Sequence, residues 1–327
     1  MQELPTYAGV HEIASDDEFV YIRTTGLGFH IMGPWFRNNN NLFPNYPANN
    51  ADIFRFPRNV EIPDSKTPTS VGAIGYFVDG VAMFDSRDAF SYSTPNGQDE
   101  TPGNGATVNG NNIWQRDAFV NESSTFGAAF AHPAGRFYHY HANAPALRHI
   151  LGDSVDYDAS TNIYTESSNN EHSPIIGWCR DGLPVYGPYS YSDPEDSSSS
   201  IRRMISGFQL RDGSNGADDL RQNAGTDSQG MDTGRTTLPQ WVERNDDSVS
   251  TTVLNPNRYD PSTSLVVGGE TYALGRYLQD WAYKGDLNGY DLYEGASTDG
   301  GFIEGTHYDL NEYNARFTVT PEFPEGT

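Results

Sequence analysis

Apolar and polar residues alternate along much of the chain, which is the period of a β-strand and not of a helix. The clearest runs are residues 19–23 and 29–32 near the start and the aromatic stretch 114–141 in the middle. Side chains of a strand point alternately to opposite faces, so each run has one face to bury and one to expose. We therefore predict strands in these three regions.

Two apolar segments contain Asp-Gly, the strongest short signal of a β-hairpin. Asp79-Gly80 lies within 71–84 and Asp181-Gly182 within 174–192. The segments form an internal repeat, because 74–84 and 176–186 both read Ile-Gly, three residues, Asp-Gly and then alternating apolar residues ending in an aromatic. Either two related β lobes face each other across a site, or one hairpin is used twice.

Helical spacing of apolar residues is confined to two segments. Residues 145–151 predict one or two turns, and 274–284 predicts the best helix of the chain. Polar stretches rich in Gly, Asn or Asp predict loops at 37–52, 93–112, 153–171 and 211–235. The predicted fold class is mainly β, sandwich-like or built of two related β lobes, with a few short helices and long loops.

The composition agrees with a β-rich chain of substantial size. With 327 residues it is long enough for one large β domain or two smaller ones. We expect a single unit over 1–327, with lobes 1–125 and 126–327 if it divides. Aromatic residues make up 13%, and the 33 Gly and 20 Pro indicate many turns, so a core of Tyr and Phe in sheets is favoured.

The charge argues against several classes of partner. A net charge of −24 repels nucleic acid, which is bound by neutralising its phosphates with Lys and Arg, and it repels an anionic membrane surface in the same way. No stretch reaches the roughly 18 apolar residues that a membrane-spanning helix needs. The acidic residues are scattered, so we interpret them as a source of solubility.

Histidines carry the clearest chemical signal. Five of the eight lie between residues 132 and 172, namely His132, His139, His141, His149 and His172. His139 and His141 are two residues apart in a strand-like run, so both imidazoles lie on one face and can reach one metal ion, at ~2.0–2.1 Å per nitrogen. Pro133-Ala134-Gly135 predicts a turn that brings His132 back over this strand, and His172 opens the second hairpin as a further ligand candidate.

Several functions are compatible with such a cluster. Imidazole ligands favour zinc, copper or iron over magnesium. With an open coordination position the chain would be an enzyme, a zinc-dependent hydrolase or a copper oxidoreductase acting on a carbohydrate or aromatic substrate, and Tyr140, His149 and Tyr186 are the candidates for its lining. Four protein ligands would indicate a binding module with a structural metal and a small-molecule or glycan partner. Histidines that only form hydrogen bonds would indicate a structural protein.

Other chemistry is less clearly indicated. Residues 286–291 place Asp and Asn oxygens at short intervals, so calcium is an alternative, although the EF-hand pattern is missing. No Gly-x-Ser-x-Gly elbow, His-Glu-x-x-His motif or phosphate-binding Gly loop occurs. The single cysteine, Cys179, excludes a disulfide within the chain, and its apolar neighbours predict a buried side chain and not a nucleophile.

Several segments together resemble the YHYH family of bacterial proteins. They are Tyr138-His139-Tyr140-His141, the preceding 132–135, then 172–177, 181–189, and the tail from 309–314 to 320–327. The resemblance implies a secreted, periplasmic or cell-surface protein. A signal peptide is not visible, so we expect the first Met to precede a mature domain, and we expect the C-terminal strand to be cut short. The family is named for its motif, and the resemblance implies no reaction.

Overall fold

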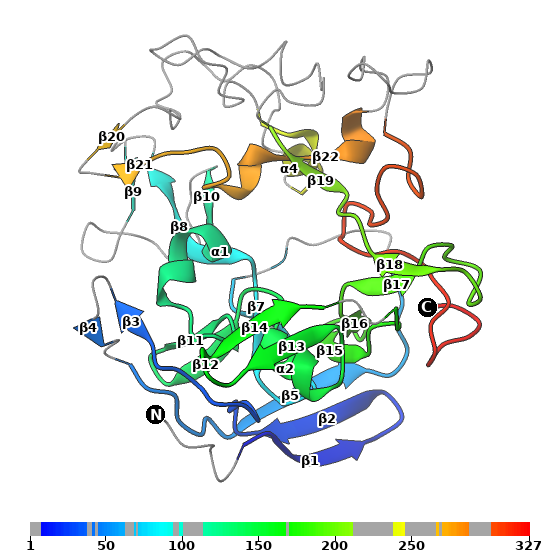
Figure 1. Cartoon of the computed structure of the whole chain (residues 1–327), viewed down its shortest axis with the longest axis horizontal. Helices are drawn as coiled ribbons and strands as arrows, with labels where there is room; N and C mark the ends of the chain where they lie inside the picture. The colour runs from blue at the N-terminus through cyan, green and yellow to red at the C-terminus, as the bar shows by residue number, and fades with distance from the viewer. Residues whose placement is uncertain are drawn as a thin grey trace.

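The computed structural model describes residues 8–37, 41–42, 45–62, 69, 71–93, 98–100, 114–167, 170–211, 238–245, 266–267, 270–287 and 302–327. Over these residues the structure is built mainly of strands, with one six-stranded sheet, two three-stranded sheets and several two-stranded ribbons (Figure 1). The predicted mainly β fold class is confirmed. No helix in the described ranges is long and apolar enough to cross a membrane.

The six-stranded sheet forms the centre of the molecule. Its order is β11 (Ala131–Ala134), β12 (Phe137–Tyr140), β7 (Ala82–Phe84), β6 (Ala73–Phe77), β15 (Ile175–Cys179) and β16 (Pro184–Tyr186). All neighbours are antiparallel except β12 and β7, which are parallel. Strands from both sides of residue 125 therefore belong to one sheet.

The internal repeat forms a pseudo-two-fold pair within this sheet. Each copy is a hairpin that turns at its Asp-Gly, as predicted, and β6 pairs with β15 so that Tyr76 lies opposite Trp178, its own counterpart in the repeat. The hydrogen bonds obey the same symmetry, since Val78 N donates to Ile176 O and Arg180 N donates to Ile74 O, each at a length near 2.9 Å. The hairpins lie side by side in one sheet and do not face each other across a site.

A second sheet covers one face of the first. It consists of β1 (Val10–Ser15), β2 (Phe19–Thr24) and β5 (Asp52–Pro57), all antiparallel. Ile22 and Phe56 of this sheet form an apolar cluster with Tyr76 and Ala82 of the six-stranded sheet. The two layers give the sandwich-like arrangement expected from the alternating runs.

The main core lies on the opposite face of the six-stranded sheet. Tyr138 and Tyr140 are fully buried there against Trp35, Phe77 and Leu147, the last from α2 (Pro145–Ile150). The short helix predicted at 145–151 is therefore confirmed. The strand predicted at 29–32 is wrong, because this segment forms irregular structure that directs His30 and Met32 into the core.

Two further sequence predictions are wrong. Residues 274–284 form no α-helix but a turn, a 3-10 segment (Leu278–Asp280) and the strand β22 (Trp281–Tyr283). The buried Asp280 carboxylate accepts hydrogen bonds from the amides of Gly275 and Tyr277, and this local bonding replaces the helical ladder. The stretch 114–141 is not continuously strand-like, because α1 (Ala118–Glu122) and a 3-10 turn (Ser123–Thr125) interrupt it.

The remaining elements surround the two layers. They are β3 (Phe36–Arg37), β4 (Asn41–Leu42), β8 (Arg87–Ser93), β9 (Gln98–Asp99), β10 (Gln115–Asp117), β13 (Val155–Asp158), β14 (Ile163–Glu166), β17 (Tyr189–Tyr191), β18 (Ile201–Arg203), β19 (Phe208–Leu210), α4 (Gln240–Asn245), β20 (Val266–Val267), β21 (Glu270–Thr271) and the 3-10 turn Lys284–Leu287. The hairpin of β13 and β14 stands where a loop was predicted. The predicted loop after residue 211, most of 93–112 and the calcium candidate beyond residue 287 lie outside the described residues.

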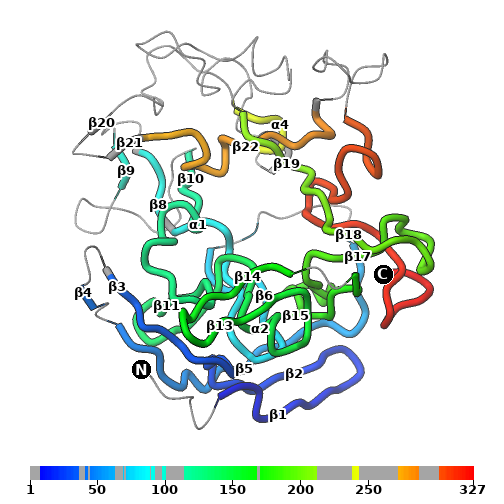
Figure 2. The backbone as a smooth tube through the Cα atoms, viewed as in Figure 1, coloured from blue at the N-terminus to red at the C-terminus, as the bar shows by residue number. Residues whose placement is uncertain are grey.

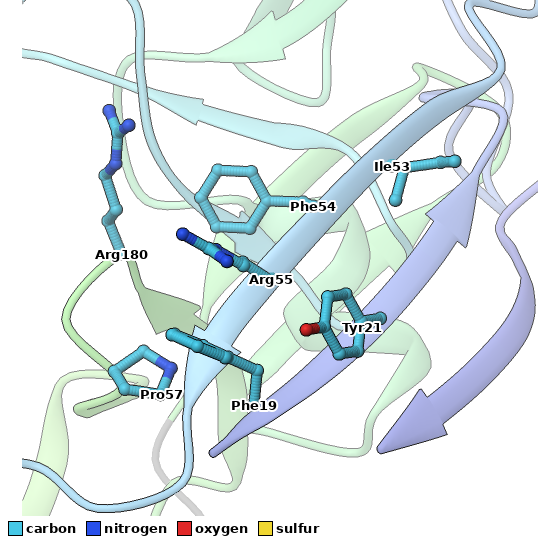
Figure 3. Close-up of a pocket in the computed structure, with 7 residues that line it drawn as sticks. All are labelled: Phe19, Tyr21, Ile53, Phe54, Arg55, Pro57 and Arg180. Carbon is cyan, nitrogen blue, oxygen red and sulfur yellow. The ribbon is translucent and has the colours of Figure 1, made fainter. Parts of the chain in front are cut away.

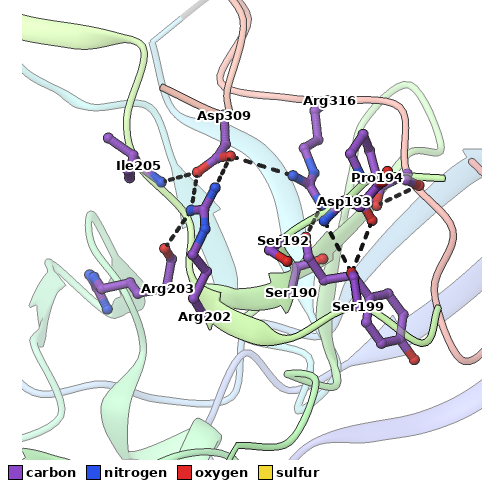
Figure 4. A network of polar contacts seen from close by, with 12 residues as sticks. Ser190, Ser192, Asp193, Pro194, Ser199, Arg202, Arg203, Ile205, Asp309 and Arg316 are labelled. Atoms are coloured by element: carbon purple, nitrogen blue, oxygen red, sulfur yellow. Dashed lines mark hydrogen bonds and ion pairs between the residues drawn. The ribbon is translucent and has the colours of Figure 1, made fainter. Parts of the chain in front are cut away.

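The C-terminal segment returns to β17 and β18, as the tube in Figure 2 shows. The buried Asp309 carboxylate accepts two hydrogen bonds from Arg202 of β18, at 2.6 and 2.7 Å, and lies 3.6 Å from Arg316 (Figure 4). Burial opposes ionisation, but the hydrogen bonds from Arg202 and the Ile205 amide outweigh it and lower the pKa of Asp309. This ion-pair network ties the tail to the body of the protein.

Candidate metal centre

Three histidines and one glutamate converge at the end of the six-stranded sheet. His132 belongs to β11, His139 to β12, His141 follows β12 directly, and Glu122 is the last residue of α1. One ligand atom from each side chain lies within 4.8 Å of all the others. The structure therefore brings together three of the four predicted ligand candidates and adds a carboxylate.

The β11–β12 hairpin explains how the histidines meet. His132 pairs directly with His139, so their side chains share one face of the ribbon, and His141 follows two residues later on that face. The turn consists of Gly135 and Arg136, with Gly135 at a φ of +61°. Pro133 and Ala134 belong to β11, so His132 is presented by the neighbouring strand and not by the predicted loop.

Helix α1 supplies Glu122 from outside the sheet. Its N-cap is Asp117, whose carboxylate accepts a hydrogen bond of 3.0 Å from Val120 N. The first turn of the helix is also held to the sheet region, because Ala118 N donates to Ser86 O. Five residues after the cap, Glu122 directs its carboxylate toward the histidines.

Each histidine is oriented by an acceptor at its Nδ1 atom. His141 Nδ1 lies 2.7 Å from Asp85 O, and His139 Nδ1 lies 3.1 Å from Phe137 O. His132 Nδ1 lies 2.7 Å from Thr125 Oγ1, whose own proton is donated to Glu122 O at 2.7 Å. Carbonyl oxygens only accept, and the Thr125 hydroxyl has no second proton to donate. All three Nδ1 atoms are therefore the donors.

This orientation leaves three unprotonated Nε2 atoms directed at one point when the imidazoles are neutral. His139 Nε2 and His141 Nε2 are 3.1 Å apart, and Glu122 Oε2 lies 3.3 Å from both His132 Nε2 and His141 Nε2. Although these contacts are close, Glu122 Oε2 is buried and has no aligned hydrogen-bond donor. Four potential ligand atoms, three nitrogens and one carboxylate oxygen, thus lie close to one another.

The surroundings of the cluster shift the pKa of two of its members, His139 and Glu122. Burial lowers the pKa of His139 to about 3, with further contributions from His141 and His132. Burial opposes ionisation of Glu122, but hydrogen bonding and charge from His132 and His141 outweigh it and lower its pKa to about 2. A neutral imidazole at His139 and an ionised carboxylate at Glu122 are the forms that bind metal ions.

Phenylalanines surround the polar cluster. Phe84 stacks on His139, with ring centroids 4.0 Å apart, and Phe126 meets His132 edge-on at 5.0 Å. Phe119 and Phe130 contact each other further out and remain 45% and 38% exposed. Phe130 has a φ of +58°, an unfavourable conformation for a bulky residue. The centre therefore has an apolar rim.

The fourth predicted ligand lies elsewhere. His172 Nδ1 is 2.8 Å from Ser173 O and its Nε2 is 3.1 Å from Ser190 Oγ, so its ring serves local hydrogen bonds. His172 is only half-buried and packs against Tyr186 and Tyr191. The geometry offers Glu122 as the fourth ligand in its place.

The three predicted lining residues are also separate from the cluster. Tyr140 points to the opposite face of β12, where its hydroxyl approaches His30 at 3.4 Å. His149 is exposed on α2 and bonds to Val155 O, and the Tyr186 hydroxyl bonds to Thr320 and Glu322. Cys179 also has no reactive character, since burial raises its pKa to about 11.

Sequence reasoning missed Glu122, Thr125 and the Asp85 carbonyl. Glu122 is one of 44 acidic residues and belongs to no recognisable spacing with the histidines. The available signal for α1 was Asp117, a residue type that often caps helices. The aromatic residues around it favoured a strand instead. The backbone carbonyl of Asp85 has no sequence signature at all.

Comparison with known proteins agrees with the segments noted in the sequence. No curated protein and no solved structure matches the chain. The family model described as YHYH protein matches residues 53–327, which include the six strands of the central sheet and all four residues of the cluster. The chain therefore belongs to the YHYH family.

Proposed function

We propose that this protein binds one transition-metal ion, zinc or copper, through Glu122, His132, His139 and His141. The observation that carries the proposal is the set of three Nε2 atoms and one carboxylate oxygen within 4.8 Å of one another, in which Glu122 Oε2 is buried without an aligned donor. For a tetrahedral ion with bonds of ~2.0–2.1 Å, neighbouring ligand atoms are about 3.3 Å apart. Three of the separations, at 3.1 to 3.3 Å, match this value, and all four atoms lie within 4.8 Å of one another.

A cluster without metal would need protons in its place. One imidazole would then donate from Nε2 to Glu122 or to a neighbouring histidine, either as a cation or by giving up its hydrogen bond at Nδ1. At His139, burial and repulsion by the other two imidazoles oppose the cation, and the neutral alternative loses the bond at Nδ1. A divalent ion satisfies all four lone pairs at once, so it accounts better for the orientation that the Nδ1 acceptors impose.

The donor set narrows the choice of ion. Three imidazoles and one carboxylate suit zinc or copper and do not suit calcium or magnesium, which prefer oxygen ligands. No thiolate belongs to the cluster. The proposed location outside the cytoplasm, secreted, periplasmic or on the cell surface, rests on the resemblance to the family.

Catalysis is a second candidate function, supported by the exposure of the ligands. Glu122 keeps 24% of its side-chain exposure, against 8% for His132 and 5% for His141. A substrate would therefore approach from the Glu122 side, past the phenylalanine rim. Zinc there would support a hydrolase and copper an oxidoreductase, provided that the ion takes a fifth ligand or Glu122 moves aside. Four protein ligands favour binding as the first function.

Elemental analysis of protein purified without a histidine tag tests the proposal. We expect about one equivalent of zinc or copper per chain after equilibration and dialysis. His139→Ala with His141→Ala should abolish stoichiometric binding, and Glu122→Gln should weaken it. His149→Ala and His172→Ala are matched controls outside the cluster and should retain a full equivalent. Absence of bound metal in the parent protein, or full loading of the double variant, would refute the site.

A further inference from the structure

The outer face of the N-terminal sheet contains a groove that shares no residue with the metal centre. Its volume is about 500 Å³, and it is lined by Phe19, Tyr21, Ile53, Phe54, Arg55, Pro57 and Arg180 (Figure 3). This size is within the range of sites that bind small organic molecules. The groove is open to solvent along its length, so it suits a ligand that remains partly exposed.

The strand register builds the groove. Phe19 lies opposite Pro57, and Tyr21 lies opposite Arg55, so alternate residues of β2 and β5 point to the same outer face. The rings of Phe19 and Tyr21 are 6.1 Å apart between centroids. They form an aromatic surface on which Arg55 lies over the Phe19 ring, while the Tyr21 hydroxyl donates to Asp16 Oδ2 at 2.9 Å.

Arg180 completes the groove from the other sheet. It precedes the Asp181-Gly182 turn, where Gly182 has a φ of +92° and a Cβ would lie 2.7 Å from Pro57 O. Glycine therefore allows the tip of the hairpin to reach the end of β5. Figure 3 shows Arg55 and Arg180 on the same side of β5, beside the ring of Phe54.

Both arginines line the groove, and in Figure 3 the Arg180 side chain extends past the ring of Phe54. The Arg55 guanidinium lies 4.2 Å from the centre of the Phe19 ring, which fixes its plane. Within the described part of the chain, neither Arg55 nor Arg180 forms an ion pair, whereas Arg23 on the same face pairs with Glu12 at 3.3 Å. In a chain of net charge −24, two arginines that line one groove without an ion pair among the described residues are a local exception.

We infer that this groove binds a short acidic oligosaccharide, whose sugar rings stack on Phe19 and Tyr21 while a uronic carboxylate pairs with Arg55 and Arg180. Arginine recognises carboxylates through two parallel hydrogen bonds. The open shape favours sugars over a flat aromatic acid, which would be enclosed on most sides. A long polyanion such as nucleic acid is disfavoured, because two arginines cannot offset repulsion by the whole chain.

Calorimetric titration with trigalacturonate tests the inference, with the uncharged galactose trisaccharide as the matched ligand. We expect the acid trimer to bind and the neutral trimer to bind at least about tenfold more weakly. Arg55→Gln and Arg180→Gln should each weaken the acid trimer about tenfold, and increased salt should weaken it as well. Arg23→Gln, on the same face but outside the groove, is the control and should bind like the parent.

Several results would overturn the inference. They are equal binding of the neutral trimer, unchanged binding by the Arg55→Gln and Arg180→Gln double variant, no binding of the acid trimer at millimolar concentration, and tighter binding of an aromatic carboxylate than of the sugar acid. Far-UV circular dichroism verifies that each variant is folded. The outcome is independent of metal content, because the groove and the metal centre have no residue in common.

Discussion

Replacing Thr125 by Val tests whether the proposed metal centre depends on its hydrogen-bonded surroundings. Valine has nearly the shape of threonine, but it lacks the hydroxyl that accepts the Nδ1 proton of His132 at 2.7 Å. The His132 side chain is only 8% exposed, so water cannot easily replace this acceptor. The proton then stays unpaired, or it moves to Nε2 and blocks the ligand position.

The expected loss of metal affinity follows from these two outcomes. An unsatisfied buried N–H costs about 1–3 kcal/mol, and removal of such supporting partners lowers metal affinity about 10- to 100-fold. A factor of ten in affinity corresponds to about 1.4 kcal/mol, so the cost of the unsatisfied N–H and the expected loss of affinity agree. Competition with a chromogenic chelator of known affinity measures this difference directly, for zinc and for copper separately.

Thr125→Ser is the matched control, because it restores the hydroxyl while removing only a methyl group. We expect the serine variant to bind metal nearly as tightly as the parent. Equal affinity in the valine variant would refute the role of Thr125, provided that calorimetry shows the same unfolding temperature. Equal weakening in both variants would indicate that packing, and not the hydroxyl, positions His132.

Two predictions concern the fold itself. Gly75→Ala should destabilise the protein by about 1–3 kcal/mol, since a Cβ there would lie 2.4 Å from Trp178 O, and Gly177→Ala should cost less because its nearest backbone oxygen is 2.9 Å away. Urea denaturation compares the unfolding free energies of the two variants. A fully stable Gly75→Ala variant would contradict the close pairing of β6 with β15. Burial lowers the pKa of His30 to about 4 from 6.5, so the unfolded chain takes up a proton first as the pH falls and stability decreases by about 3 kcal/mol between pH 6.5 and 4. His30→Gln should reduce this slope in urea titrations made with a chelator present, and an unchanged slope would show that His30 is not responsible.

Features that depend on near neighbours in the chain could be predicted before the structure was known. The two Asp-Gly hairpins formed as predicted, because the glycine that ends each three-residue loop adopts the positive φ that the turn needs. The helical spacing of apolar residues at 145–151 also predicted the short helix α2 correctly. The same spacing failed at 274–284, because the Asp280 carboxylate bonds to nearby amides, and a local side-chain acceptor of that kind is invisible to a periodicity of apolar residues.

Of the candidate metal centre, only the three histidines could be predicted in the same way from residues close together in the chain. The placement of His139 and His141 on one face follows from the two-residue period of a strand, and a hairpin joins His132 to them within ten residues of sequence. Glu122 and the exclusion of His172 were decided by tertiary structure. The packing of α1 against the sheet selects one carboxylate among 44, whereas β15 and β17 direct His172 toward Ser190. Such choices depend on contacts between elements, and no spacing along the chain encodes them.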